Sequence, residues 1–296
     1  MPWFTRRRRS SEAPEEVGSP VSSLLPHTSQ EQHRLFFQHY MMRTILGGNI
    51  AAPLSTPPLS VVDVGCGTGQ WALEVAYEIP SAKVVGIDLE LPQVDTSHPQ
   101  YPRNCSFECL NALEPLPFAP QSIDYLHLRF MSSSIPLASW PQVIPRLVSY
   151  LKAGGWMEWI ESGPIYAGGP AFNRLCAAWD EFGQRRGHLA RPGPQIAQAL
   201  QASGLINVAY QPVRVPIGAY GGRLGRMTAQ DGIAIFRALR PGILKFQIMT
   251  QQEFDWCLEQ AQFEVNDPQS SLQTTWEIAI AYGQRGVSRP SLPRRR

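Results

Sequence analysis

The residues with the clearest chemical meaning are three glycines after a hydrophobic run, in the segment VVDVGCGTG at residues 61–69. Gly65, Gly67 and Gly69 let the backbone turn tightly and let a ligand approach without Cβ atoms in the way. A helix beginning after this loop would present free N–H groups, which favour an anionic ligand group. The pattern G-x-G-x-G lacks both the spacing of the dinucleotide fingerprint and the Lys-Ser/Thr pair of a phosphate loop. NAD and ATP therefore fit this loop poorly.

Asp88 is the second residue with a chemical meaning. It follows the apolar run 83–87, nineteen positions after Gly69, in a run with no visible local need for an acid. In an open α/β sheet this position lies at the carboxyl edge beside the glycine loop, where a carboxylate can accept hydrogen bonds from both hydroxyls of a ribose. Together, the loop and Asp88 predict an adenosine-containing ligand whose other end is not a pyrophosphate.

Two histidines are candidates for proton transfer. His127 lies near the end of the apolar run 123–128, where it could serve as a base or be a buried, hydrogen-bonded structural histidine. His188 follows two arginines and could reach a substrate from a cap. The sequence contains no carboxylate pair or nucleophile triad, and the spacing of Cys105 and Cys109 does not suggest zinc. We therefore expect no metal site and chemistry that comes from a cofactor.

Alternating strand and helix signals must position these residues. Short β-branched runs predict strands, and apolar residues at helical spacing predict the segments between them. Strands are expected at 60–64, 83–88, 105–109, 123–128, 156–160 and 273–282, and helices at 30–46, 71–79, 143–151, 171–183, 194–203, 228–240 and 250–264. This order predicts an α/β fold, a Rossmann-like doubly wound and mostly parallel sheet with an N-terminal helix and a helical cap inserted before the last strand.

Composition excludes several classes of protein. The chain has 296 residues, 43% of them hydrophobic and 17% charged, which suits a globular protein with a sizeable core. Its apolar runs are too short to span a membrane, and five scattered cysteines in apolar contexts favour a reducing, cytoplasmic location. Eight of the 26 basic and three of the 24 acidic residues lie at the two ends, so the body has a net charge of about −3. Nucleic acid is therefore not expected as the main ligand.

The pattern also predicts a division of the chain. An Arg-, Ser-, Pro- and Glu-rich start, including the run Arg6 to Arg9, is expected to be a mobile tail, and its arginines do not lead into the apolar core of a secretory signal. The expected parts are a disordered tail at 1–29, an N-terminal helix and loop at 30–58, a cofactor-binding core at 59–219, a helical cap at 220–267, the last core strand at 268–285 and a tail at 286–296.

From about residue 38 to residue 285, the sequence resembles the class I methyltransferases that use S-adenosylmethionine. The resemblance rests on segments 63–69 and 88–89, on Asn111-Ala112 at the usual Asp-Ala position, on 123–129, and on LKAGGW at 151–156. It implies S-adenosyl-L-methionine as cofactor, held by Tyr40, Asp63, Gly65, Cys66, Gly67, Gly69, Asp88, Leu89, Asn111, Ala112 and Leu128. Within this family, QHY at 38–40, GQWA at 69–72 and HLR at 127–129 look most like small-molecule methyltransferases of microbial and fungal secondary metabolism.

Three details refine the resemblance. Asn111 could still bond the adenine amino group through its side-chain oxygen, and Cys66 would contribute a backbone N–H. Pro145 requires its helix to start at about Ile144, and Trp71 is expected to pack in the core rather than contact the cofactor.

The expected activity is methyl transfer to the oxygen or carbon of a small, apolar or aromatic metabolite. The same binding motifs would serve a non-methylating pericyclase or cyclase, or a regulatory methyltransferase-like protein. A homodimer is left open.

Overall fold

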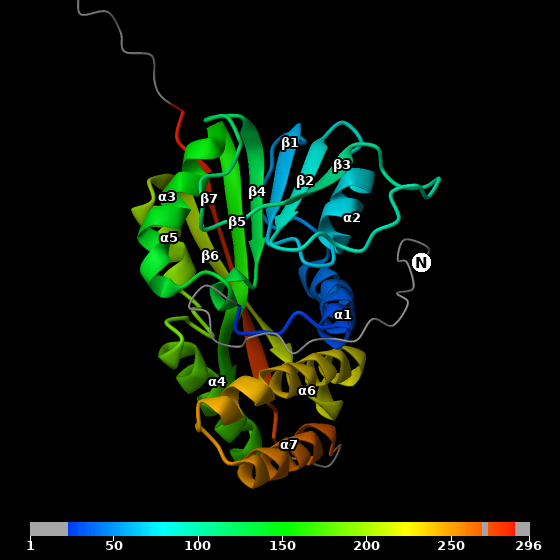
Figure 1. Ribbon diagram of the computed structural model, residues 1–296, viewed down its shortest axis with the longest axis vertical. Helices are drawn as coiled ribbons and strands as arrows, with labels where there is room; N and C mark the ends of the chain where they lie inside the picture. The colour runs from blue at the N-terminus through cyan, green and yellow to red at the C-terminus, as the bar shows by residue number, and fades with distance from the viewer. Residues whose placement is uncertain (1–22, 268–271, 288–296) are drawn as a thin grey trace, which may run out of the picture.

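A computed structural model describes residues 23–267 and 272–287. They form a seven-stranded sheet in the order β3-β2-β1-β4-β5-β7-β6 (Figure 1). Its strands are β1 Ser60–Val64, β2 Lys83–Asp88, β3 Cys105–Cys109, β4 Ile123–Arg129, β5 Leu151–Tyr166, β6 Leu205–Pro216 and β7 Thr275–Arg285. The pairs among β1 to β5 are parallel, whereas β7 runs antiparallel to both β5 and β6. The expected Rossmann-like, mostly parallel sheet is confirmed.

Seven α-helices and three short 3-10 helices accompany the sheet in the described ranges. The α-helices are α1 Ser29–Leu46, α2 Gln70–Glu78, α3 Trp140–Tyr150, α4 Pro170–Arg185, α5 Gln195–Ala202, α6 Gly222–Lys245 and α7 Gln251–Asn266. The 3-10 helices are η1 Met131–Ser133, η2 Leu137–Ser139 and η3 Ala219–Gly221. Within the same ranges, no helix combines the length and apolar character that a membrane span requires.

The two faces of the sheet have separate hydrophobic cores because side chains alternate along each strand. Val61 of β1 belongs to the core that contains Trp71 of α2. Its neighbour Val62 belongs to the core that contains Ile144 of α3 and Leu200 of α5. In Figure 1, α2 accordingly lies on one side of the sheet and α3 and α5 lie on the other. The parallel strands are thus covered on both faces, as their apolar composition requires.

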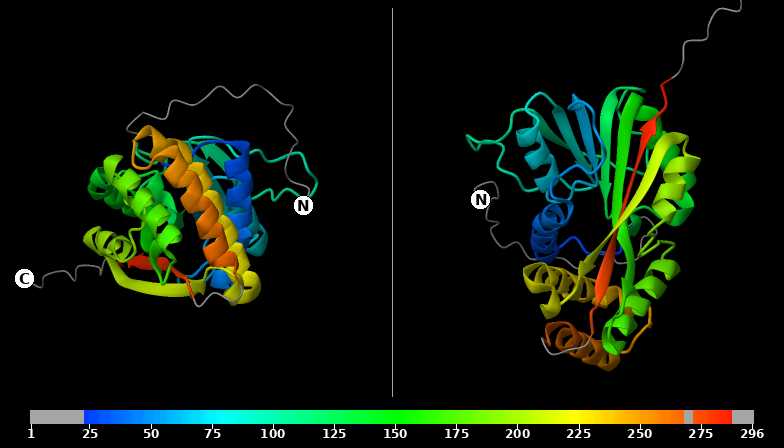
Figure 2. Two further views of the ribbon diagram at one scale, coloured as in Figure 1. Left: turned by 90° about the horizontal axis from the view of Figure 1, so that it is seen from below. Right: turned by 180° about the vertical axis from the view of Figure 1, so that it is seen from behind.

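The remaining helices gather beyond one end of the sheet. In Figures 1 and 2, β5, β6 and β7 extend from the sheet towards α4, α6 and α7, while α1 lies between β1–β3 and α6. Contacts join α1 to α6, and α4, α6 and α7 to one another. In the chain, α6 and α7 lie between β6 and β7. We refer to residues 219–266 as the cap segment.

A buried ion-pair network holds α1 against α6. Arg34 donates to Oδ1 of Asp231 at 2.8 Å and, through two nitrogens, to both carboxylate oxygens of Glu31. Gln38 donates to Oδ2 of Asp231 at 3.0 Å. Burial alone would lower the pKa of Arg34, but Asp231 and Glu31 raise it overall. The guanidinium therefore stays charged and joins two helices that are far apart in sequence.

Pro145 does not mark a helix start. The helix α3 begins at Trp140 and contains Pro145 in its interior, so the expected start near Ile144 is wrong. Burial of Val143, Ile144 and Leu147 compensates for the hydrogen bond that the proline cannot donate. The strand β5 begins at Leu151, so the turn at Gly154-Gly155 belongs to the strand and not to a helix cap.

The expected tail at 1–29 is too long by at least six residues. Residues 1–22, including Arg6 to Arg9, lie outside the described residues, but residues 23–28 pack on the body. The N–H of Leu24 donates to the carbonyl of Ser133 at 2.9 Å, and the Leu24 side chain is buried. Thr28 caps α1 by accepting from the N–H of Glu31. Two adjacent leucines and a helix cap are thus enough to anchor this part of the segment.

Candidate functional site

The glycine loop between β1 and α2 adopts a conformation that favours glycine. Gly65, Gly67 and Gly69 have φ angles of 73°, 53° and 73°, in the left-handed region that L side chains rarely adopt. A Cβ atom on Gly65 would lie 2.0 Å from Sδ of Met131, and one on Gly69 would lie 2.6 Å from the ring of Phe107. Both the backbone conformation and the close packing therefore require glycine here.

Four N–H groups of this loop are already used inside the protein. Those of Gly65 and Cys66 donate to the carbonyl of Ile87, and that of Gly69 donates to the carbonyl of Cys66. The N–H of Gly67 donates to Asp88. The expectation that Cys66 offers its N–H to a ligand is therefore wrong, because β2 accepts that bond. A loop with these donors occupied is a poor cradle for a pyrophosphate.

Asp88 lies half-buried where β2 ends. Its Oδ2 accepts from the N–H of Gly67 at 2.7 Å and its Oδ1 accepts from the N–H of Leu89 at 2.7 Å. Burial raises the pKa of Asp88, whereas these bonds lower it and leave a smaller net rise. The position thus has a local need for an acid, contrary to the sequence-based expectation. Each carboxylate oxygen keeps a further lone pair with which it can accept from a ligand hydroxyl.

The other expected cofactor residues divide into two groups. Leu89 is exposed, and Asn111 and Ala112 are half-buried, so all three are accessible beside the ends of β2 and β3. Oδ1 of Asn111 accepts from the N–H of Leu113 at 2.9 Å, which uses one of the two lone pairs expected to face an adenine. Leu128 is fully buried in the core under α3. Its side chain therefore packs inside the protein, and its backbone lies between β1 and β5.

The helix α1 lies over the glycine loop. A Cβ atom on Gly67 would lie 3.6 Å from a methyl carbon of Leu35, which is ordinary van der Waals contact. On the same helix, Tyr40 is half-buried, with its ring edge-to-face against Phe36 at 5.1 Å. His39 is fully buried and lies 3.0 Å from Glu74 of α2 and 3.4 Å from Arg129. Through these contacts α1 covers the glycine loop.

His127 is held inside the core. Its Nδ1 lies 2.8 Å from Oδ1 of Asp63, and its ring stacks on Trp71 with centroids 3.8 Å apart. The side chains of His127 and Asp63 are almost completely buried. Trp71 also donates to the carbonyl of Asn49, so it packs in the core as expected. This geometry favours the structural alternative for His127 and gives Asp63 a partner within the sheet.

His188 belongs to a second buried polar group, which sequence reasoning missed. Its Nδ1 lies 3.2 Å from the carbonyl of Ser132, and burial lowers its pKa. The N–H and hydroxyl of Ser132 both donate to Glu161 of β5, at 2.7 and 2.8 Å. Trp159 also donates to Glu161, at 2.8 Å. The glutamate follows the apolar run of β5, but nothing in its spacing reveals that it is buried.

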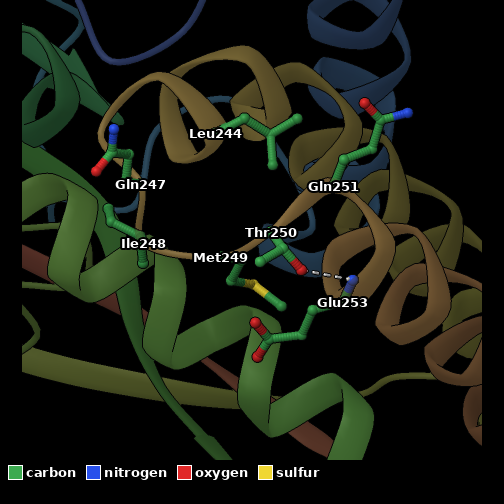
Figure 3. Close-up of a pocket in the computed structure, with 7 residues that line it drawn as sticks. All are labelled: Leu244, Gln247, Ile248, Met249, Thr250, Gln251 and Glu253. Atoms are coloured by element: carbon green, nitrogen blue, oxygen red, sulfur yellow. Dashed lines mark hydrogen bonds between the residues drawn. The ribbon is translucent and has the colours of Figure 1, made fainter.

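Two hollows in the described part of the chain are relevant to ligand binding. One, of about 560 Å³, lies where α6 turns into α7 and is lined by Leu244, Gln247, Ile248, Met249, Thr250, Gln251 and Glu253 (Figure 3). None of these residues belongs to the glycine loop. The other is a cavity of about 30 Å³ lined by residues of α1, η1, β5, α4, α6 and β7 and of the loops beside them, with Glu161 in its wall. Only the second lies beside the strand ends at which ligands bind in this type of sheet.

The charges around the glycine loop suit a cationic ligand better than a phosphate. Asp63, Glu74 and Asp88 contribute carboxylates at or near the loop, and the cations beside them are Arg129 and Arg43, the latter 3.3 Å from Glu74. The pKa of Arg129 is lowered by burial, although Asp63, Glu158 and Glu74 offset part of the fall. The donor set thus fits a sulfonium-bearing nucleoside, with Asp88 available for ribose hydroxyls. Among the residues described, no group of three potential ligand side chains could hold a metal ion.

Comparison with known proteins agrees with this geometry. Residues 61–155 match the family described as "Methyltransferase domain". A segment of 141 residues is 39% identical to "Secondary metabolism regulator laeA" of Aspergillus fumisynnematus, covering 47% of this chain and 36% of that protein. "Methyltransferase pytC" of Aspergillus terreus is 26% identical over 230 residues, which cover 72% of this chain and 69% of the relative. The chain thus spans only about a third of the length of the regulator.

A solved structure shares the fold. Phosphoethanolamine N-methyltransferase 2 of Haemonchus contortus, determined with S-adenosylhomocysteine, superposes with a TM-score of 0.50 at 17% identity. The superposition covers 84% of this chain and 57% of that one. The matched segment runs from β1 into β5 and contains the glycine loop and Asp88, so this part of the chain is similar to a methyltransferase domain.

Proposed function

We propose that this protein transfers the methyl group of S-adenosylmethionine to the oxygen or carbon of a small, apolar or aromatic metabolite. The observation that supports this most directly is the glycine loop, four of whose N–H donors are occupied and whose surroundings are acidic. Such a loop suits a sulfonium-bearing nucleoside. The matched methyltransferase domain covers the same residues.

The residues present fit this cofactor in distinct ways. Asp88 would accept from the ribose hydroxyls, Asn111 and Ala112 would flank the adenine, and Tyr40 would cover the ligand from α1. The glycine loop would support its methionine portion, a space that the side chain of Met131 borders. When bound, the cofactor supplies an activated methyl group. The chain itself has to bind, align and shield the two reactants.

Binding is the first test of this proposal. Titration calorimetry with S-adenosylhomocysteine, NAD and ATP should give saturable binding for the first ligand only. Saturation at about 100 times the dissociation constant should stabilise the fold by about 2.7 kcal/mol, visible as a higher melting temperature. A larger thermal shift with NAD would contradict the assignment.

Product analysis is the second test. The protein and a methyl-labelled donor should be incubated with extracts that contain candidate metabolites. Label in a small molecule supports the proposal. A rearranged but unlabelled product would support a pericyclase or cyclase, in which the same cofactor acts without transferring its methyl group.

A regulatory methyltransferase is the second candidate. It is supported by the 39% identity to a relative named as a regulator of secondary metabolism, over a segment that contains nearly half of this chain. In this case the acceptor would be a protein side chain. Label in protein and none in small molecules, in the experiment above, would favour this candidate over metabolite methylation.

A further inference from the structure

The cavity beside Glu161 has aromatic walls and a polar corner. Phe130 and Trp276 stack at 6.0 Å with an angle of 19° between their rings, and both line the cavity together with Trp179. Leu25, Ala190 and Ile235 add apolar surface, and Ser132, Ser133, Glu161 and Ser162 add polar surface. A flat, apolar ligand with one polar group matches this lining.

Glu161 is a buried carboxyl group without a cationic partner. Its side chain is 1% exposed, and in the described part of the chain no Lys, Arg or His nitrogen lies within ion-pair distance of it. Its hydrogen bonds come from Ser132 and Trp159, which orient the group but do not neutralise it. Burial raises the pKa of Glu161 to about 7, although these donors lower it in part. The group can therefore exchange a proton near neutral pH.

The charged groups that face this cavity are already paired with others. Arg34 of α1 lines the cavity, but it bonds Glu31 and Asp231 of α6. His188, in the loop after α4, directs Nδ1 to the carbonyl of Ser132 and not to Glu161. Neither Trp276 of β7 nor Trp179 of α4 carries a charge. Glu161 is thus the titratable group with spare capacity for a ligand here.

The cavity also holds a hydrogen-bond donor, the indole N–H of Trp179, in addition to the Glu161 carboxylate. Its buried indole N–H has no acceptor among the described residues, and the side chain lines the same cavity. A buried donor without a partner costs free energy, so a ligand oxygen placed there would be favourable. One group that can both accept from Trp179 and donate to Glu161 is a hydroxyl. An ammonium group can only donate hydrogen bonds, so it would leave the indole N–H of Trp179 without an acceptor.

The cavity adjoins the glycine loop through two consecutive residues. Met131 packs on Gly65, and Ser132 holds Glu161. Two consecutive residues of η1 therefore connect the Glu161 carboxylate with the glycine loop, where the proposed methyl donor would lie. At about 30 Å³ the cavity has room for little more than one water molecule, so a substrate must displace a wall. Leu25, Phe130 and Ala190 are the lining residues that belong to neither a helix nor a strand, and Leu25 comes from the segment before α1.

From this arrangement we infer that Glu161 is the proton acceptor for an O-methylation, and that the substrate presents a phenolic or enolic hydroxyl on a flat apolar skeleton. This inference rests on the proposed function and specifies its substrate class. The hydroxyl oxygen forms the new bond to the methyl carbon, and the carbon–sulfur bond of the donor breaks with its electron pair going to sulfur. The hydroxyl proton passes to the Glu161 carboxylate, so charges and atoms balance. Ser132 acts as a positioning residue.

The inference is tested with two probes that differ by one proton donor, 2-naphthol and 2-methoxynaphthalene. At about pH 8, where the Glu161 carboxylate is ionised, wild-type protein should bind 2-naphthol about 10-fold to 100-fold more tightly. The preference should fall at about pH 6, where the carboxyl group is mostly protonated. Glu161→Gln should bind both probes with similar affinity at both pH values. Equal affinities in the wild type, or no saturable binding of 2-naphthol, would overturn the inference.

Three controls separate Glu161 from its surroundings. Trp179→Phe should lower the affinity for both probes by a similar factor, since each probe carries an oxygen that can accept a hydrogen bond from the indole N–H. Glu253→Gln, a carboxylate of α7 lining the hollow in Figure 3, should change neither affinity. If Glu161→Gln fails to fold, Ser132→Ala should reduce the preference, because it removes the hydroxyl that orients Oε2 of Glu161, and an unchanged preference would count against the inference.

Two further arms separate this inference from the proposed function. Wild type and Glu161→Gln should bind S-adenosylhomocysteine equally, and loss of this binding in the wild type would refute the proposed function instead. A preference for the cationic probe 2-naphthylmethylamine over 2-naphthol would overturn the hydroxyl assignment while leaving methyl transfer intact.

Discussion

Oδ2 of Asp88 accepts a hydrogen bond from the N–H of Gly67 at 2.7 Å, so the acidic end of β2 also shapes the glycine loop. The carboxylate therefore has two tasks, one toward the loop and one toward a ribose. Substitutions that preserve one task and remove the other can tell them apart.

Asp88→Ala should weaken binding of S-adenosylhomocysteine by roughly 10-fold to 100-fold, because bonds to charged groups contribute about 1.5 to 3 kcal/mol. It should also lower the free energy of unfolding by about 1 to 3 kcal/mol, because Gly67 and Leu89 lose an acceptor. Asp88→Asn keeps an oxygen acceptor and should recover much of the stability but less of the affinity. Calorimetric titration beside urea denaturation measures both effects. Unchanged affinity in folded Asp88→Ala would refute the ribose assignment.

Gly65→Ala should be more damaging than Gly47→Ala. Both glycines have similar positive φ angles, 73° and 71°, so the backbone cost of adding a Cβ is about 1 to 2 kcal/mol in each case. Only Gly65 has a neighbour, Met131, in the space that the Cβ would fill. Gly65→Ala should therefore also abolish cofactor binding, whereas Gly47→Ala should retain it. Thermal melts with and without S-adenosylhomocysteine compare the pair, and equal ligand-induced shifts would argue against the loop as the binding site.

Asp231→Ala should destabilise the protein by about 3 kcal/mol, because it leaves the buried Arg34 with only one of its two carboxylate partners. Asp255→Ala, which breaks a pair with Arg240 on the surface of the cap segment, should have a much smaller effect. Chemical denaturation of both variants provides the comparison. If Asp231→Ala is as stable as Asp255→Ala, the α1–α6 network contributes little to stability.

Wild-type stability should fall as the pH rises through neutrality, relative to Glu161→Gln. The pKa of Glu161 is raised from 4.5 to about 7, so the folded state holds this proton more tightly than the unfolded state does. Its contribution is fully present below about pH 4.5 and is lost by about pH 8, a difference of about 3 kcal/mol. Urea midpoints of both proteins across this range test the claim. Parallel pH profiles would mean that the carboxyl group titrates normally.

The parallel part of the fold could be predicted from sequence because most of its strands are short runs that are apolar on both faces. The strand bounds at 60–64, 83–88 and 105–109 were predicted to the residue, and the helices 30–46 and 250–264 to within two residues. β5 could not be delimited in the same way, because Gly154-Gly155 looks like a turn. The pairing of β5 with β4 includes Leu151 and resumes at Trp156, so these glycines lie in an irregular part of the strand.

The candidate site was predictable only where one local segment carries it. The spacing of the glycines and of Asp88 predicts the loop and the acid beside it. The hydrogen bonds that the loop N–H groups donate to β2 could not be predicted, because they depend on β2 lying beside β1. Nothing in the sequence marks Glu161, because its donor Ser132 lies in η1 and the residues around the adjacent cavity include members of α1 and α4. The role of residues 220–267 as a lid stays a prediction.

The contact between Arg34 and Asp231 has a consequence for synthesis of the chain. These residues are 197 positions apart, so α1 leaves the ribosome long before its partner in α6 has been translated. Until then the guanidinium has only Glu31, its neighbour on the same helix. This local pair keeps the face of α1 that will later be buried polar and hydrated until α6 has been synthesised, which limits the tendency of the nascent chain to aggregate. Closure of this long loop should then be a late and slow step of folding.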